Sequence, residues 1–440
     1  MSLQKKAYGR LLLCLLLTMA FACLLVHSLA GGTLLVHSVY DSYALQAENW
    51  LAGRTWIADG EKYTWLELAV YEGRYYVSFP PVPSVLALPW AAFLGGAQAV
   101  PSNLLAALYG LFTAAGVFSL LARRGAAPLR CLFWAVLICC GSGFWWMSTN
   151  GGVWFTAQVL NLCFVAWGLF FACGDGTAQH TLAAFLLALA VGCRPFSILL
   201  LALYMALLLA RGAGAQTLLA AAGKSGALYE KLPPPKRGRL HRPGADFWLP
   251  LAAAAAVGAA LAWYNWMRFG SILEFGHNYL PEFVRAKEGQ FSMAYFLPNL
   301  VQMLRPVVLN KQLNLVFPVI NGFSLFLANP AFLLWAVQLA RRARQKRLSW
   351  LDAAMVICWM AALAALCVHK TMGGWQFGAR YTVDLLPYVL LTELPLRPEK
   401  HAQPRASPDF RAAPPAGWEW MLCVWAVLFN LYGAVYMLGR

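Results

Sequence analysis

An arginine lies inside a long apolar stretch of this sequence. Arg194 stands near the middle of the apolar run 182–210 and is followed by Pro195. An arginine at the centre of a bilayer costs about 2.5–3.5 kcal/mol, so its presence in such a segment indicates a functional site. A guanidinium group binds phosphate through two parallel hydrogen bonds, which makes Arg194 a candidate phosphate ligand. The alternative is an arginine that extends toward lipid headgroups.

Three further bases are candidates for the same task. Arg268 follows a Trp-rich stretch, and Lys370 and Arg380 lie in the stretch 369–387, which reads HKTMGGWQFGARYTVDLLP. Bases beside aromatic residues at the end of a membrane helix also serve as interfacial anchors, and this is the alternative for each. Together with Arg194 they form a predicted basic cluster that would bind the phosphate of a donor substrate.

An acid stands ahead of an amphipathic stretch. Asp41 precedes a segment that places Ala44, Ala47 and Leu51 on one helical face. At that position it would cap the helix. A carboxylate at the membrane surface is also well placed to accept the proton of an acceptor hydroxyl or amine. Asp41 is therefore the candidate general base, and capping is compatible with that role.

Glu48, Glu274 and His277 are candidates for an acceptor site or a secondary site. Glu48 lies one helical face around from Asp41, and its alternative is a solvated charge. Glu274 and His277 lie in a glycine-punctuated turn after a helix end, and their alternative is a plain anchored turn. No second histidine has ligand spacing to His277, so the sequence requires no metal ion and leaves the use of a divalent cation open.

The composition places these residues in a membrane protein. Of the 440 residues, 60% are hydrophobic and 12% are charged, against about 45–50% and about 25% in soluble domains. This excludes a soluble enzyme and a nucleic-acid binder of the usual kind. At roughly 20 residues per span, the chain has room for about eleven transmembrane helices. The predicted fold is all-α and polytopic, and 11–30 is predicted to be a retained first helix.

The basic residues predict the orientation. The net charge is +16, and bases concentrate at the N-terminus and in the connections 123–130, 211–246, 341–347 and 397–416. Cytoplasmic loops are enriched in Lys and Arg. These connections and the N-terminus are therefore predicted to be cytoplasmic, with bases that set orientation and need no anionic partner.

Helix parity then decides two ambiguous runs. The proline-bounded run 83–100 is predicted to lie at the outer interface, or to dip in and return. The run 182–210 is predicted to be two short helices that meet at Arg194. The long outer loops become 31–102, which holds amphipathic interfacial helices, and 268–314.

Several short motifs carry a family resemblance through their order along the chain. They are Tyr40-Asp41, Pro80-Pro81, Arg194-Pro195, YNWMRFGSILEFG and FGARYTVDLLP. They resemble the polytopic membrane glycosyltransferases of the GT-C fold, which use polyprenyl-phosphate-linked sugars. That group includes protein O-mannosyltransferases and the transferases that add aminoarabinose to lipid A. The resemblance covers most of residues 1–390.

The resemblance implies an inverting sugar transfer on the outer face of the plasma membrane. The donor would be a polyprenyl-phosphate-linked sugar, with Asp41 as the general base. In such enzymes basic residues hold the lipid phosphate, and Arg194, Lys370 and Arg380 are the candidate matches. The motifs depart from many members at Phe79, where those members have lysine, and at 148–152, where they have an acid. The second departure puts metal use in doubt.

An alternative of another class is a transporter or flippase for a lipid-linked sugar. Such proteins often contain inverted repeats and mid-membrane charges in both halves, and neither is visible in this sequence. The predicted division is a catalytic transmembrane module at 1–267, a second long outer loop at 268–314, and C-terminal transmembrane helices at 315–440. The sugar and the acceptor are not identified by the sequence.

Overall fold

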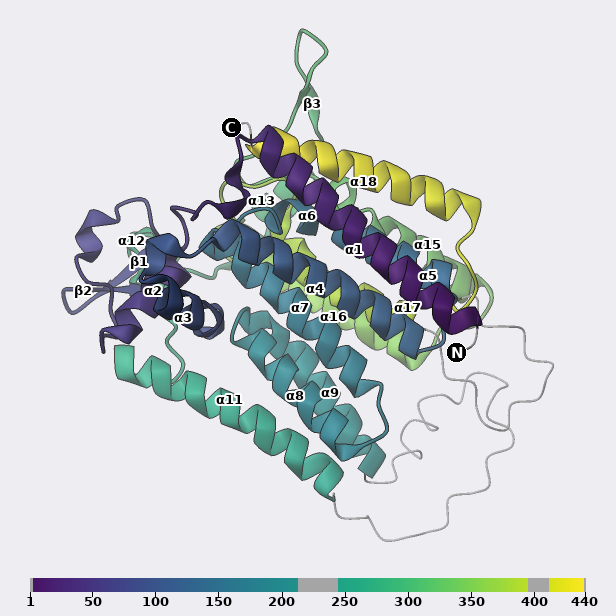
Figure 1. The fold of residues 1–440 in the computed structure, drawn as a ribbon, viewed down its shortest axis with the longest axis horizontal. Helices are drawn as coiled ribbons and strands as arrows, with labels where there is room; N and C mark the ends of the chain where they lie inside the picture. The colour runs from purple at the N-terminus through teal and green to yellow at the C-terminus, as the bar shows by residue number, and fades with distance from the viewer. Residues whose placement is uncertain (1–2, 213–243, 395–410, 439–440) are drawn as a thin grey trace.

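The protein is a bundle of helices with a group of loops at one end (Figure 1). The computed structural model describes residues 3–212, 244–394 and 411–438, and 68% of it is helical. In these ranges six helices are long and apolar enough to cross a membrane. They are α1 (Leu3–Leu29), α4 (Ser102–Arg123), α7 (Val153–Ala172), α11 (Ala245–Phe269), α16 (Trp350–Cys367) and α18 (Gly417–Leu438).

Shorter helices fill the remaining positions that the apolar runs predict. They are α5 (Pro128–Cys139), α8 (Thr177–Val191), α9 (Ile198–Gly212), α15 (Ala331–Arg344) and α17 (Leu386–Glu393). The predicted all-α, polytopic fold is therefore confirmed. Two predicted connectors lie largely outside the described residues: 213–243, which includes the bases from Lys224 to Arg242, and 395–410, which includes those from Arg397 to Arg405.

The predicted turn at Arg194 is present. α8 ends at Val191, the 3-10 turn η4 covers Pro195–Ser197, and α9 begins at Ile198. Pro195 has no N–H to continue the α8 hydrogen-bond ladder, so the run 182–210 breaks there. The result is an arginine at a helix junction, not in the middle of a span.

One apolar run is not a continuous helix. Within 315–340, the strand β4 (Leu315–Val316) pairs with β3 (Val308–Leu309), and helical structure resumes only at α14 (Leu325–Ala328) and α15. Pro318 and Gly322 fall between the strand and the first helix and disfavour a continuous helix. Hydrophobicity alone overstated the length of this helix.

The loop end of the bundle, where residues 31–101 lie, contains α2 (Ser42–Leu51) and α3 (Val82–Leu94) packed on each other. α2 confirms the helix predicted after Asp41. Between them β1 (Leu68–Tyr71) and β2 (Arg74–Val77) form an antiparallel hairpin with Leu68 opposite Val77. The sequence analysis did not predict this hairpin. α13 (Phe296–Leu304) and α12 (Pro281–Val284) belong to the second long loop.

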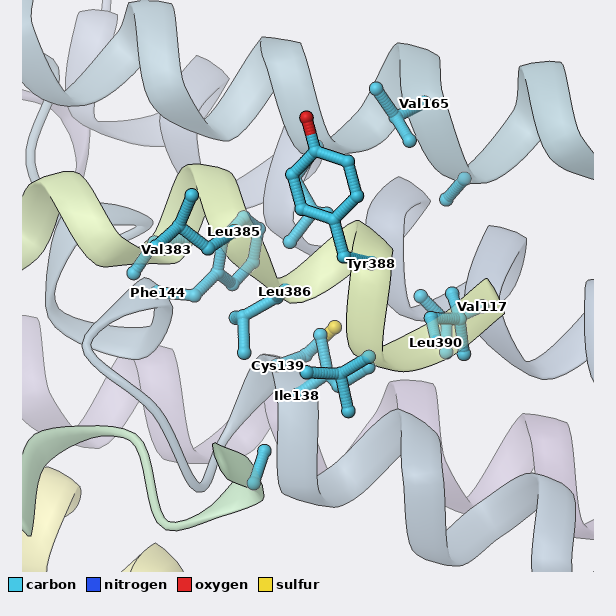
Figure 2. Close-up of a cluster of buried hydrophobic side chains, with 14 of the residues drawn as sticks. Val117, Ile138, Cys139, Phe144, Val165, Val383, Leu385, Leu386, Tyr388 and Leu390 are labelled. Atoms are coloured by element: carbon cyan, nitrogen blue, oxygen red, sulfur yellow. The ribbon is translucent and has the colours of Figure 1, made fainter. Parts of the chain in front are cut away.

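A short helical segment passes through the core and fixes part of the site. The 3-10 helix η7 (Arg380–Leu385) leads directly into α17. Figure 2 shows Leu386 and Tyr388 of α17 between Val165 of α7 and Ile138 of α5. These side chains are nearly or wholly buried. Because η7 continues into this packed segment, the core holds its residues in place.

Three of the bases predicted to set the orientation are buried in ion pairs within the protein, at the opposite end of the bundle. Arg130 contacts Glu419 at 2.9 Å. Arg342 lies 3.0 Å from Glu393 and 3.4 Å from Asp352. In the same cluster, Arg411 lies 3.6 Å from the Asp352 carboxylate. The sequence analysis did not predict these internal pairs, which form because α5, α15, α16 and α18 converge there and exclude solvent from the charges.

We expect Arg342→Met to lower the thermal unfolding midpoint in detergent strongly. Removing one partner of a buried ion pair costs about 3–5 kcal/mol, because the remaining charge stays buried. Arg344→Met is the matched control, since Arg344 is on the same helix and exposed. Equal midpoints for the two variants would contradict the structural role of Arg342.

Candidate active site

The loop end encloses a cavity of about 370 Å³. Its wall comes from the α8–α9 junction, the loop that follows α11, the end of α16 and the start of η7. Lining residues with polar or aromatic side chains include Trp154, Arg194, Glu274, His277, His369, Arg380 and Tyr381. Four of the predicted site residues, Arg194, Arg380, Glu274 and His277, are therefore on one cavity.

Arg380 is a buried cation on this wall, with 3% of its surface exposed. Its Nε and Nη2 donate to the Gly373 carbonyl at 3.2 and 3.0 Å, and its Nη1 donates to Gln158 Oε1 at 3.1 Å. Among the described residues, no carboxylate lies within ion-pair distance of Arg380. Its charge is solvated by neutral carbonyl and amide dipoles of the protein.

Arg194 is the second cation of the cavity, and its side chain is 13% exposed. Its Nε donates to Asp384 Oδ2 at 2.9 Å, and no hydrogen bond to the described residues engages its terminal nitrogens. Arg194 and Arg380 stack against the same ring, Tyr381, at 5.1 and 4.8 Å from its centroid. The two guanidinium groups thus face one region of the cavity.

Asp384 positions Arg194 and was missed by the sequence analysis. Its carboxylate also accepts hydrogen bonds from Gln158 Nε2 and Asn161 Nδ2, each at 3.3 Å. A signal for it was available: Asp384 is an acid in an apolar segment, four residues after Arg380, and the rule that singled out Arg194 applies to it equally.

Asp41 caps α2 and lies beside the cavity wall, though not among its lining residues. Asp41 Oδ1 accepts from the backbone N–H groups of Tyr43 and Ala44, both at 3.1 Å. The ring of the preceding residue, Tyr40, packs 5.5 Å from that of Trp154, which lines the cavity. Burial, which leaves 6% of the residue exposed, raises the pKa of Asp41 to about 7.

The other two bases of the predicted cluster are not on the cavity. Arg268 is buried, donates to the Val77 carbonyl at 2.7 Å, and stacks 4.1 Å from the Tyr264 ring centroid. It therefore joins the end of α11 to β2. Lys370 donates to the Glu282 carbonyl. It follows His369, which lines the cavity, but does not line the cavity itself.

The three candidates for a secondary site occupy different places. Glu48 is partly exposed, near Gly96 at the end of α3, and does not line the cavity. Glu274 lines the cavity and accepts from the N–H of Gly276 at 2.6 Å. His277 packs against Phe79 with ring centroids 5.3 Å apart. Burial lowers the pKa of His277 to about 4, so the imidazole is neutral at pH 7.

His369 is a second neutral histidine of the cavity that the sequence analysis missed. Its Nδ1 lies 2.9 Å from the Thr371 carbonyl and its Nε2 lies 3.2 Å from the Gln290 amide nitrogen. The backbone N–H of Thr371 lies 3.2 Å from the same Nδ1, so the Thr371 backbone and Gln290 together hold the ring in place. Burial lowers the pKa of His369. Within the described ranges, no three His, Cys, Asp or Glu side chains gather as a metal site, and we assign no metal ligand.

The fold is similar to that of solved membrane glycosyltransferases. No protein-family model matches the sequence, and no curated protein matches it. The apo oligosaccharyltransferase of Archaeoglobus fulgidus aligns with a TM-score of 0.50 and 16% identity over 98% of this chain and 56% of that one. The same enzyme in complex with an inhibitory peptide and a dolichol-phosphate aligns with a TM-score of 0.51 and 15% identity over 100% of this chain.

This chain has the GT-C fold. It spans 56% of the length of the oligosaccharyltransferase. ArnT from Cupriavidus metallidurans, bound to undecaprenyl phosphate, is also similar, with a TM-score of 0.46 and 13% identity over 86% of this chain and 59% of that one. The two oligosaccharyltransferase alignments confirm the GT-C fold that the order of the sequence motifs predicted.

We expect the stability of the protein to fall as Asp41 ionises. Because the folded-state pKa of Asp41, about 7, lies above the ordinary pKa of 3.8 that it has when unfolded, the folded state binds this proton more tightly, and stability decreases as pH rises between these values. Asparagine keeps a helix cap and carries no charge. The unfolding midpoint of Asp41→Asn, relative to wild type, should therefore rise from pH 5 to pH 8. A constant difference would show that Asp41 ionises normally.

Proposed function

We propose that this protein is a glycosyltransferase that moves a sugar from a polyprenyl-phosphate-linked donor to an acceptor on the outer face of the plasma membrane. The observation that carries the proposal is Arg380, a buried cation that no carboxylate of the described residues pairs, on the wall of a cavity that it shares with Arg194. A buried charge is normally paired. An anionic ligand in the cavity would complete this site.

A phosphate suits the two guanidinium groups. The terminal nitrogens of Arg194 are available for hydrogen bonds, and Asp384 fixes their direction through Nε. Arg380 is held rigidly by Gly373 and Gln158. Preorganised cations of this kind stabilise the negative charge that develops on a leaving phosphate. Support comes also from the fold, since the oligosaccharyltransferase that shares it was solved with dolichol-phosphate.

The transfer assigns a role to Asp41. The bond between the anomeric carbon and the phosphate oxygen breaks, and its electron pair stays on the phosphate. The acceptor oxygen or nitrogen forms the new bond to that carbon from the opposite face, which inverts the anomeric centre, and its proton passes to Asp41. A pKa of about 7 matches the ideal for a general base at neutral pH. The acceptor would approach past Trp154, which lines the cavity and packs against Tyr40, the neighbour of Asp41.

Asp41→Asn is expected to lower the transfer rate by roughly 10²-fold or more, the usual contribution of a general base. The wild-type rate should rise with pH up to about 7 and then level off, since only the carboxylate accepts a proton. The measurement is turnover of a radiolabelled polyprenyl-phosphate sugar in detergent micelles. Glu48→Gln is the control and should keep wild-type turnover. Full activity of Asp41→Asn at normal expression would remove Asp41 from the mechanism.

Arg380→Gln is expected to abolish phosphate binding while Arg268→Gln retains it. Both arginines are buried, but only Arg380 lines the cavity. A polyprenyl phosphate at about 100 times its Kd should stabilise wild type by about 2.7 kcal/mol. We expect that ligand-dependent rise of the unfolding midpoint in wild type and in Arg268→Gln, but not in Arg380→Gln. Equal loss in both variants would indicate a general folding defect. Phosphate binding without transfer would favour a flippase.

A further inference from the structure

The second long loop exposes an apolar surface at the loop end of the molecule. In α13, Leu297 and Val301 are 64% and 60% exposed, and Leu304, three residues on, is 48% exposed. This spacing places them on one helical face, while Met303 is fully buried. A one-sided apolar face of this kind marks a contact surface.

The β3–β4 hairpin extends this surface away from the bundle. Figure 1 shows the hairpin projecting beyond the helices, beside the ends of α1 and α18. Every residue of its two strands is exposed, and Leu313 in its turn is 79% exposed. Beyond the hairpin, Ile320 is 63% exposed. The hairpin therefore has no covered face within the described residues.

The foot of the hairpin fixes its level along the bundle. Phe317, which directly follows β4, packs against Tyr436 and Tyr432 near the end of α18, with ring centroids 5.0 and 5.9 Å apart. α18 is one of the helices long and apolar enough to span a membrane. Tyrosines at the end of such a helix mark the membrane–water interface. The hairpin thus leaves the protein at the membrane surface.

The segment that contains α13 and the β3–β4 hairpin carries only positive charges. Between Glu288 and Asp352 the sequence contains no acidic residue. Arg305 follows α13, and Lys311 stands in the hairpin turn, next to the exposed apolar residues. Basic residues beside an interfacial apolar surface are attracted to anionic lipid headgroups.

We infer that α13 and the β3–β4 hairpin form a membrane anchor that lies in the plane of the leaflet on the cavity side. Their apolar side chains insert among the acyl chains, and Arg305 and Lys311 contact anionic headgroups. This interaction surface is separate from sugar transfer and does not depend on it. The hairpin projects sideways from the helices that span the bilayer, so the leaflet is the surface that it meets first.

The anchor is also joined to the cavity wall. Asn299 of α13 donates to the carbonyls of Cys367 and His369 at 2.8 and 2.7 Å. Gln302 donates to the Gly322 carbonyl at 2.7 Å, which ties the end of the hairpin segment to the same helix. The depth at which α13 rests in the leaflet therefore sets the level of His369, and with it the level of the cavity.

The test is photocrosslinking from single positions in nanodiscs. Benzoylphenylalanine replaces Leu313 or Val301, both exposed, and the protein is reconstituted in phosphatidylglycerol and irradiated. Mass spectrometry of the chain is expected to show lipid adducts at both positions. The control is benzoylphenylalanine at Glu288, an exposed charged residue of the same loop, which should yield at least tenfold fewer adducts.

Each alternative occupant gives a different product. Crosslinked dimers at positions 313 and 301 would identify a second copy of the chain and overturn the anchor. Adduct yields no higher than at position 288 would show a water-facing surface and overturn it as well. Exchange of phosphatidylglycerol for phosphatidylcholine should lower the yield severalfold, and Lys311→Glu should reduce that difference. If the protein that keeps Lys311 gave equal adduct yields in both lipids, the proposed headgroup contact would be overturned.

Discussion

The cost of holding a cation in a low-dielectric interior is the constraint on which this structure depends. The effective penalty for burying one ion is several kcal/mol even after relaxation, and a guanidinium group cannot lose its proton to avoid it. The cavity is built around two such groups. Arg380 is surrounded by carbonyl and amide oxygens that were placed before any ligand arrives. Asp384 restrains Arg194 at one nitrogen only.

The fold meets this constraint by making the segment that carries Arg380 part of the core. η7 runs into α17, and α17 packs between α5 and α7 (Figure 2). Gln158 belongs to α7, so the acceptor for Arg380 comes from a helix that the same core holds. A guanidinium group placed on a free loop would relax toward water and lose its electrostatic effect on a substrate. Packing energy far from the cavity therefore keeps the charge in its productive place.

Local signals in the sequence predicted part of this arrangement. Proline lacks a donor, so Pro195 located the junction at Arg194, and the amphipathic period after Asp41 located α2. Pairings between distant segments left no such signal. Asp384 lies 190 positions from Arg194 along the chain, and the contact depends on how α7, α8 and η7 pack.

The same limit explains what the sequence did not reveal. Arg342 belongs to a basic run that reads as a cytoplasmic loop, and its burial depends on Glu393 from another helix. The run 315–340 is apolar throughout, yet its first residues form half of an exposed hairpin. Hydropathy reports which side chains avoid water, and it does not distinguish a membrane span from an interfacial surface.

Three buried arginines show how differently the charge can be compensated. Arg342 contacts two carboxylates. Arg268 stacks 4.1 and 4.7 Å from two aromatic ring centroids, and its Nη1 donates to the Val77 carbonyl, so ring faces and a carbonyl of the protein compensate its charge. Arg380 has more distant rings, at 4.8 and 5.4 Å, and it alone of the three lines the cavity. Where the protein needs only stability, it supplies the anion or the ring face itself. Where the described residues supply no carboxylate beside a cavity, the natural completion is a bound anion, which is why we propose Arg380 as the ligand of a donor phosphate.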